Sequence, residues 1–149
     1  MDAPIDPGNL TDEELRLELA SFGPHAAHKV PAYHFRMLHT VTGQELGTIN
    51  LRVSSIPHVE LYAGHVGYLV HEPHRGHRFA ARSLRLLAPL ALRLGLNPLW
   101  ITCNPDNWAS RRTLEIAGAQ LAEIIEVPED NIIRRDGHPT KCRYRLDVE

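Results

Sequence analysis

The sequence is poor in several features that would point to particular classes of protein. It has two cysteines in 149 residues, too few for a disulfide framework, so Cys103 and Cys142 are expected to be free thiols in a reducing compartment. No apolar run approaches the length that crosses a bilayer, and no charged-then-apolar leader opens the sequence. The formal net charge of -2 argues against nucleic acid or an anionic membrane as partner. A soluble, cytoplasmic protein is the expectation.

What is present is ordinary globular composition, with 43% hydrophobic and 23% charged residues. The length suits one domain with a real core. Residues 1–13 are acidic and turn-rich, with Pro4 and Pro7, and predict a flexible N-terminus. Residues 14–149 are expected to form a single domain.

Short strands are predicted in the first half of the chain. Leu15, Leu17 and Leu19 alternate with charged residues, which is the period of a strand. The expected strands cover residues 14–20, 33–38, 47–53 and 64–70, with a loop at 22–31, a hairpin turn at Gly43 and a polar loop at 54–63.

Helices enter in the second half. Residues 78–94 carry apolar side chains at helical spacing, with a bend expected at Pro89 and an end at Gly95. A strand at 99–103, a helix from Asn107 to about Ala117 closed by Gly118, and an antiparallel pair at 121–127 and 141–146 follow. A strand-helix-strand connection favours parallel flanking strands, so a mixed sheet of the α+β or α/β kind is predicted.

The most informative segment is residues 64–80, where an apolar strand runs into an arginine-glycine turn and then a long helix. This order presents backbone N–H groups at the positive end of a helix dipole. An anion is the natural ligand of such a turn, and a diphosphate is the commonest one. The segment therefore predicts a cofactor that carries a diphosphate.

Two motifs resemble those of the GNAT family of N-acetyltransferases, over roughly residues 33–147. The stretch Arg75-Gly76-His77-Arg78-Phe79-Ala80 is similar to the family's cofactor turn, Q/R-x-x-G-x-G/A, except that Arg78 replaces the middle glycine. One reading of that replacement is a right-handed helical position that tolerates a side chain, and another is weaker phosphate contact. Asn107, Ser110 and Gly118 resemble the second hallmark, and the serine is similar to the ribosomal-protein N-terminal acetyltransferase type.

The resemblance implies a GNAT-like fold, a mostly antiparallel sheet with one splayed parallel pair and flanking helices. It also implies acetyl-CoA as acyl donor, no metal, and direct transfer of acetyl to an amine. The diphosphate would bind the N–H groups of Gly76, Arg78, Phe79 and Ala80, with the side chains of Arg75, His77 and Arg78 as charge partners. The backbone of Leu69 and Val70 would hold the pantetheine arm and supply the oxyanion donor. Asn104 would touch the thioester or simply end its strand, and Asn107 would be both helix cap and cofactor contact.

Catalytic groups are harder to assign. The family's usual tyrosine proton donor falls at Leu114, so Ser110 is the available donor, unless it only bonds its own helix start. Glu60, His65 and Glu129 are the candidates for general base. A buried structural histidine and surface carboxylates are the competing readings, and a water chain would need no base at all.

The acceptor is expected to be an amine of a small molecule, a peptide or a protein. Residues 21–32 are too short for the helix pair that often shapes the family's acceptor site, and Glu60, Glu129 and Asp130 hint at a cationic acceptor. A homodimer through the closing strands is also expected. The alternative is a non-catalytic acyl-CoA-binding regulatory module, and a plain structural domain is a third reading.

Two further sets of residues are weaker candidates for a functional site. His71, His74 and His77 have a spacing that suggests a metal cluster, but Pro73 and the turn at Gly76 break the helix that would align them. Cys103 lies inside an apolar strand and is predicted to be core rather than a nucleophile.

Overall fold

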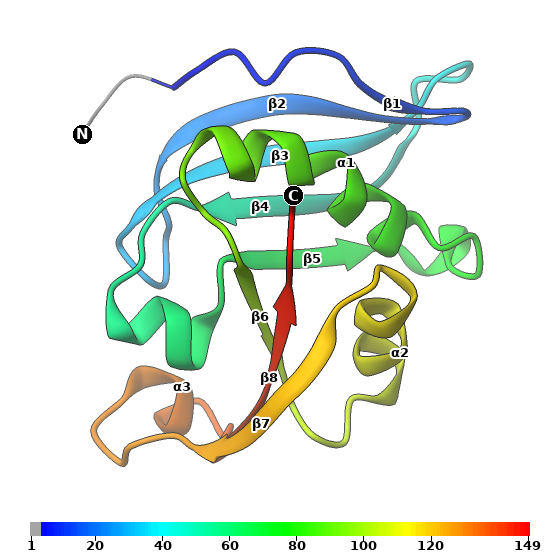
Figure 1. Cartoon of the computed structure of the whole chain (residues 1–149). Coiled ribbons are helices and arrows are strands. Elements are labelled where there is room, and N and C mark those ends of the chain that lie inside the picture. The colour runs from blue at the N-terminus through cyan, green and yellow to red at the C-terminus, as the bar shows by residue number, and fades with distance from the viewer. Residues whose placement is uncertain (1–3) are drawn as a thin grey trace.

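The strands of the protein form two antiparallel sheets, as the computed structural model, which describes residues 4–149, reveals (Figure 1). The five-stranded sheet runs in sequence order: β1 (Leu10–Asp12), β2 (Leu15–Pro24), β3 (Pro31–His39), β4 (Glu45–Arg52) and β5 (Val66–Val70). The three-stranded sheet has the order β6 (Leu99–Cys103), β8 (Thr140–Leu146) and β7 (Gln120–Glu126). The helical elements are η1 (His58–Ala63), η2 (Glu72–His74), α1 (Phe79–Arg93), α2 (Trp108–Ile116) and α3 (Ile132–Arg135).

The predicted α+β fold class is confirmed, and the splay between β5 and β6 explains why the strands divide into two sheets. The two strands meet only at their start, where the His65 N–H donates to the Trp100 carbonyl at 2.6 Å and the Trp100 N–H donates to His65 Nδ1 at 2.9 Å. Gly64 permits this contact, since a Cβ there would lie 3.0 Å from the Thr102 nitrogen. From that point the strands diverge (Figure 1). Beyond this contact, the edge strands β5 and β6 therefore face an opening between the two sheets rather than each other.

Three local predictions from the sequence were wrong. Residues 10–12, placed in the unstructured start, form β1, because Leu10 is buried and pairs with Leu17. The expected loop at 22–31 begins as a continuation of β2 to Pro24. The expected polar loop at 54–63 contains η1, a short π-helical segment that buries Val59. Leu10 and Val59 are buried and Phe22 is partly buried against the core, so packing of apolar side chains outweighs the local turn signals.

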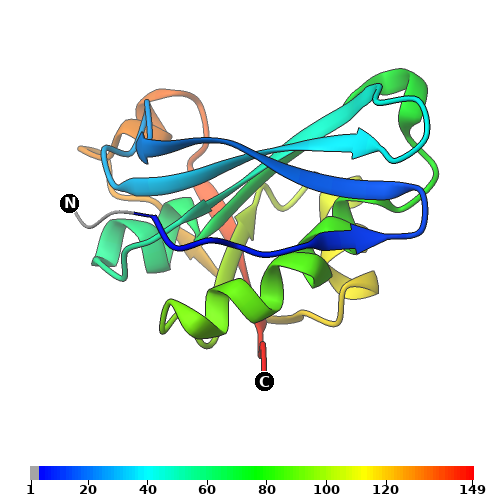
Figure 2. The ribbon, with the colours of Figure 1, turned by 90° about the horizontal axis from the view of Figure 1, so that it is seen from above.

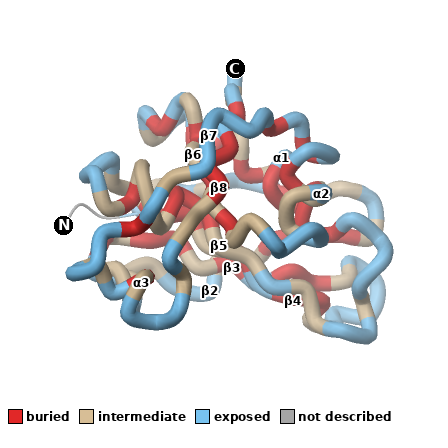
Figure 3. Tube along the Cα trace, turned by 90° about the horizontal axis from the view of Figure 1, so that it is seen from below, coloured by how far each residue is buried: buried red, intermediate tan, exposed pale blue. Residues whose placement is uncertain are grey.

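Helix α1 lies across one face of the five-stranded sheet (Figures 1 and 2). Its apolar stripe, including Leu84, Leu87 and Leu90, is fully buried against that sheet. Pro89 lies inside the helix, and Gly95 ends it at φ +77° as predicted. Buried residues concentrate where α1 and the two sheets meet (Figure 3). This core fixes the N-terminus of α1 beside the end of β5.

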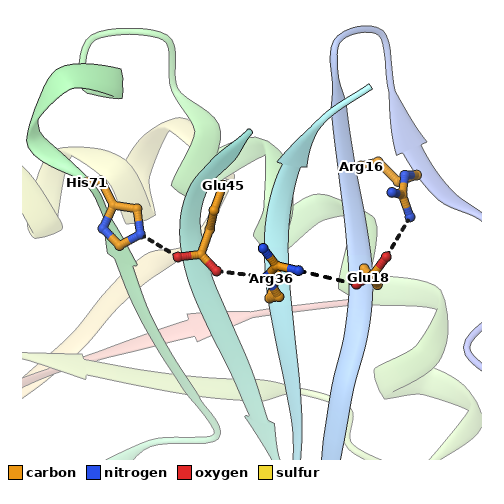
Figure 4. Close-up of polar contacts among 5 residues, drawn as sticks. All are labelled: Arg16, Glu18, Arg36, Glu45 and His71. Carbon is orange, nitrogen blue, oxygen red and sulfur yellow. Dashed lines mark hydrogen bonds and ion pairs between the residues drawn. The ribbon is translucent and has the colours of Figure 1, made fainter. Parts of the chain in front are cut away.

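An ion-pair ladder crosses the opposite, solvent-facing side of the sheet (Figure 4). It runs from Arg16 to Glu18, Arg36 and Glu45 and ends at His71, whose Nε2 lies 2.8 Å from Glu45. The Arg36 hydrogen bond, followed by that of His71, lowers the pKa of Glu45. Exposed pairs of this kind contribute little to stability individually. Their effect here is to tie the residue that follows β5 to three earlier strands.

Candidate active site

A cleft of about 890 Å³ opens where β5 and β6 diverge. One end is lined by the turn that leads into α1, including Arg75, Gly76 and Arg78. The middle is lined by β5 and by the start of α2. The far end is lined by residues from several other segments, among them His28, Arg52, Ile133, His138 and Lys141. The segments that the sequence predicted as functional thus share one continuous cavity with residues that it did not.

The turn offers a row of free backbone donors. Within residues 4–149, the N–H groups from Gly76 to Ala81 donate to no protein acceptor, because the first bond of α1 is from the Arg82 N–H to the Arg78 carbonyl at 2.9 Å. Phe79 and Ala80 are buried and fix the helix start, whereas Gly76 and His77 are exposed. Free donors at the positive end of a 15-residue helix are the arrangement expected from the sequence for an anion such as a diphosphate.

Arg78 adopts a left-handed conformation, with φ 60° and ψ 27°, at the N-cap of α1. The sequence-based reading of a right-handed position was wrong, since the family's glycine marks a backbone angle that side chains disfavour. A side chain at this backbone angle costs conformational energy that glycine would avoid. In return, Arg78 places a positive charge beside the free N–H groups, and we expect its attraction for an anion to offset that cost.

Replacing Arg78 with glycine should therefore separate charge from strain. We expect the unfolding free energy to change by at most about 1 kcal/mol, because relief of the left-handed strain offsets the greater freedom of the unfolded chain. Affinity for acetyl-CoA, measured by calorimetry, should fall. Lys29→Gly is the matched control, because Lys29 also has a positive φ (63°) and does not line the cleft. Equal affinity in both variants would remove Arg78 as a phosphate partner.

Neighbouring side chains hold the turn in place. Arg75 Nε donates to the Val70 carbonyl at 3.1 Å, joining the turn to the end of β5. Arg82 is committed to the N-terminal hairpin, where it bonds the carboxylates of Asp12 and Glu14. The strand missed in the sequence thus anchors the first turn of α1.

The backbone of β5 faces the cleft at alternate residues. The His65 carbonyl accepts from the Arg52 N–H, and the His71 N–H donates to the Leu46 carbonyl, so both residues direct their backbone groups toward β4. Because these directions alternate along a strand, Leu69, which pairs with Thr48, also directs its backbone groups toward β4. The N–H groups of Tyr68 and Val70 then point away from β4, toward the cleft. Leu69 instead contributes a side chain that is 54% exposed at the cleft wall.

Tyr68 and Ser110 meet across the cleft, with 2.5 Å between the two hydroxyl oxygens. Ser110 is a predicted site residue, and Tyr68 was missed. Burial raises the pKa of Tyr68 to about 12, so its hydroxyl keeps its proton at neutral pH. Burial likewise raises the pKa of Cys103, beside this pair, to about 11, which leaves the thiol unreactive.

The two asparagines that the sequence singled out have defined partners. The Asn107 side chain accepts from the Ser110 N–H at 3.1 Å and caps α2, leaving the Ser110 hydroxyl free for Tyr68. Asn104 Nδ2 lies 3.1 Å from Nδ1 of His138, and Asn104 Oδ1 is buried without a partner. Leu114 is fully buried, so the usual position of the family's tyrosine belongs to the core.

The three predicted bases lie away from this cavity. His65 is 1% exposed, and burial is the main cause of its lowered pKa. Its Nδ1 accepts from the Trp100 N–H, as a structural histidine would. Glu60 and Glu129 do not line the cleft, and the Glu60 carbonyl binds Arg143. Besides Tyr62, Tyr68, Cys103 and the turn residues Arg75 and Arg78, the titratable side chains that line the cleft are His28, Arg52, His74, Asp136, His138 and Lys141.

Metal binding finds no support in residues 4–149, where no group of three or more ligating side chains is placed to hold an ion. His71 pairs with Glu45, away from the cleft wall that His74 lines. Cys103 and Cys142 are free, buried thiols directly opposite one another on β6 and β8. Across the same part of the chain, no helix is long and apolar enough to cross a membrane.

A histidine pair borders the far end of the cleft. His28 Nδ1 lies 2.8 Å from His58 Nε2, and His58 Nδ1 lies 3.1 Å from Asn131 Nδ2. Burial, followed by the charge of Arg52, lowers the pKa of His28 to about 4. The pair is therefore neutral at physiological pH and is held by hydrogen bonds rather than by charge.

This lowered pKa predicts a loss of stability in mild acid. Between the ordinary pKa of 6.5 and about 4, the unfolded chain protonates His28 while the folded chain does not. Protons then favour unfolding, so stability should fall as pH drops through this window. Urea unfolding at several pH values should show the fall, with a shallower slope for His28→Gln. Equal slopes would contradict the assignment.

Comparison with known proteins agrees with this geometry. Residues 3–120 match the family described as acetyltransferase (GNAT) domain. No curated protein matches the chain. Among solved structures, the apo form of RimL, a ribosomal L7/L12 alpha-N-protein acetyltransferase, is similar with a TM-score of 0.58 and 18% identity, over 78% of this chain and 70% of that one.

Two further structures share the fold. Ribosomal-protein-S5-alanine acetyltransferase from Vibrio fischeri gives a TM-score of 0.60 and 17% identity, over 79% of this chain and 62% of that one. The microcin C7 self immunity acetyltransferase MccE, in complex with acetyl-CoA and AMP, gives 0.61 and 15%, over 78% and 61%. The chain thus spans less than two thirds of the length of these two proteins, and the likeness shows a shared fold.

Proposed function

Because the chain belongs to the GNAT family of acetyltransferases, whose reaction is acetyl transfer from acetyl-CoA to an amine, we propose that its acceptor is the α-amine of a protein or peptide. The domain is an acetyl-CoA-dependent N-acetyltransferase. Similarity to two ribosomal-protein acetyltransferases supports a protein acceptor. The short β2–β3 connection supports it too, since residues 25–30 form a turn without a helix to cover the acceptor end of the cleft.

The observation that carries the proposal is the single cleft that joins the free N–H groups of 76–80 to the Tyr68–Ser110 pair. The coenzyme supplies an activated acetyl thioester. The turn holds its diphosphate, with Arg75 and Arg78, which line the cleft, available as charge partners. The exposed side chain of His77, also predicted as a charge partner, does not line the cleft. The Val70 N–H, which faces the cleft, is the oxyanion donor.

Ser110 is the proposed proton donor to the departing thiolate. Its hydroxyl lies at the cleft wall, and Tyr68, which stays protonated, can replace the proton that Ser110 gives up. In this relay Ser110 takes the proton-donor role of the family's tyrosine, and Tyr68 on β5 restores the proton to Ser110. Asn107 orients the pair by capping α2 through the Ser110 N–H.

His138 is the proposed general base. It lines the cleft and bonds Asn104, the residue that follows β6. This role requires the flipped orientation of the Asn104 side-chain amide, with Oδ1 rather than Nδ2 facing Nδ1, which also gives the unpartnered Oδ1 a donor. Nδ1–H of His138 then donates to Oδ1, and Nε2 keeps the lone pair that can take a proton from the acceptor amine. Glu60, His65 and Glu129 have no part in the proposal, because none of them lines the cleft.

A homodimer remains part of the proposal. Strand β7 is the edge of the three-stranded sheet and exposes Leu121 and Ile124. Sedimentation of the protein and of Ile124→Lys would test whether this edge is the interface. The cytoplasmic location expected from the cysteines stays a prediction.

A matched pair of peptides tests the proposed acceptor class. One peptide has a free α-amine and no lysine, and the other has a blocked α-amine and one lysine. Thiol release from acetyl-CoA and mass spectrometry of the product should show acetylation of the first peptide in preference to the second. Preference for the lysine peptide would contradict the proposal. Binding of acetyl-CoA without turnover on any amine would support the regulatory module instead.

A further inference from the structure

Arg52 is the most unusual charged residue of the cleft. It ends β4, is only 7% exposed, and forms no ion pair within 4.0 Å in residues 4–149. Burial lowers its pKa to about 10, so it remains cationic at neutral pH. A buried cation without a counter-ion is costly unless its function supplies one.

The guanidinium is only partly satisfied by the protein. Nη1 donates to the carbonyls of Ala63 and Gly64 at 2.8 and 2.9 Å, which fixes the orientation of the group. Nε is buried without a partner, and Nη2 has no acceptor among the described residues. Nη2 lies over Gly67, where a Cβ would come within 2.6 Å of it. Gly67 thus leaves room for the guanidinium beside the cleft wall.

Lys141, on β8, brings a second cation to the same end of the cleft. Burial lowers its pKa, and the nearby charge of Arg52 lowers it further. The described part of the chain gives Lys141 no ion-pair partner within 4.0 Å. Two cations on different sheets therefore face the same cavity while the protein neutralises neither of them.

The other charges of the cavity do not cancel this pair. Asp136 lines the same end but forms no ion pair with either cation within 4.0 Å. His28, with a pKa of about 4, is neutral. Arg75 and Arg78 lie at the opposite end, beside the diphosphate turn. The acceptor end thus carries more positive than negative charge, contrary to the cationic acceptor suggested by the sequence.

We propose that Arg52 and Lys141 bind a carboxylate of the acceptor, so that the preferred acceptor is a peptide α-amine followed within the first residues by an acidic side chain. The inference rests on the proposed function and narrows its substrate class. An acidic side chain would supply the counter-ion that both cations lack, and its position would orient the amine toward the thioester.

Matched peptides test this preference. Ser-Glu-Ala-Ala amide and Ser-Gln-Ala-Ala amide have the same α-amine and differ in one charge. We expect kcat/KM to favour the acidic peptide by about tenfold, the effect of one charge-assisted contact of about 1.4 kcal/mol. The ratio should fall toward one in Lys141→Met and in Arg52→Gln, and should persist in Lys29→Met, which removes an exposed lysine outside the cleft. Equal rates for both peptides, or a ratio that survives in Lys141→Met, would overturn the inference.

A binding measurement tests the carboxylate site even if neither peptide is acetylated. In protein saturated with acetyl-CoA, acetate and phosphate are compared with chloride at equal ionic strength by thermal unfolding. We expect acetate to raise Tm in the wild type and in Lys29→Met, and to lose this effect in Lys141→Met. No rise, an equal rise in all three proteins, or a rise with phosphate alone would reject a carboxylate site. Failure of peptide acetylation together with a lysine-dependent acetate effect would reject only the peptide acceptor.

Discussion

Gly76→Val should weaken the binding of acetyl-CoA by about tenfold or more, because a loss of about 1.4 kcal/mol is enough for that factor. Gly76 has φ +93° in the turn before α1, a conformation that a β-branched residue rarely adopts. No atom lies within 4 Å of the position of a Cβ, so the substitution acts through the backbone alone. Relaxing that angle rotates the N–H groups that follow, and isothermal calorimetry would report the lost affinity.

Gly43→Val separates this effect from lost stability. Gly43 has φ +73° in the β3–β4 turn, also with nothing within 4 Å of a Cβ, and does not line the cleft. Both variants should lose about 1–3 kcal/mol of unfolding free energy. Only Gly76→Val should lose coenzyme affinity. Equal affinity in the two variants would mean that the turn does not hold the coenzyme.

Ser110→Ala should lower kcat by about a hundredfold, the usual contribution of a positioned proton donor, with little change in the KM for acetyl-CoA. Tyr68→Phe should give a similar loss, because the hydroxyl that restores the proton to Ser110 is removed. The double variant should be no slower than the slower single variant, since the two residues act as one unit. Stopped-flow measurement of acetyl transfer gives these rates.

Thr113→Ala is the control for this pair. Thr113 lies one turn further along α2 and lines the same cleft, and its hydroxyl has no hydrogen-bond partner in residues 4–149. Its loss should change kcat by less than about threefold, which is within about 0.7 kcal/mol. Additive losses for Tyr68→Phe and Ser110→Ala would instead indicate two independent roles.

The sequence predicted the order of strands and helices well because each signal is local. The apolar period of α1, the glycines after α1 and α2, and the Asn107 cap all act within one turn of their residue. The turn at residues 75–80 was found in the same way. Strand β1 was missed because it has three residues, too few to show a strand pattern in the sequence. Its pairing with β2 places it in the sheet.

The catalytic part of the site was harder to predict because it depends on long-range contacts. In the sequence, Tyr68 cannot be told from the other apolar residues of its strand. Its role depends on the contact with Ser110, 42 positions away, which forms only where β5 and β6 diverge. His138 meets Asn104 across 34 positions, inside an excursion with no periodic signal. Arg52 ends a strand, where an arginine usually reads as a solvated charge. Its burial arises from the later η1 segment, whose carbonyls bind it.

One signal in the cofactor turn does predict the backbone of Arg78. The family's middle glycine, replaced here by Arg78, marks a backbone position with positive φ. Glycine is common at such positions because side chains are strained there, so the motif itself predicts a left-handed angle. The reading of Arg78 as right-handed gave the side chain more weight than the backbone.

The most direct test of the account is an NMR titration of the ¹⁵N-labelled protein with coenzyme A. The account predicts that the amide resonances of Gly76, His77, Arg78, Phe79 and Ala80 shift together and saturate with the affinity measured by calorimetry. Amides of the β3–β4 turn around Gly43 should stay in place. Coenzyme binding that leaves residues 76–80 unmoved would contradict the claim that these N–H groups hold its diphosphate.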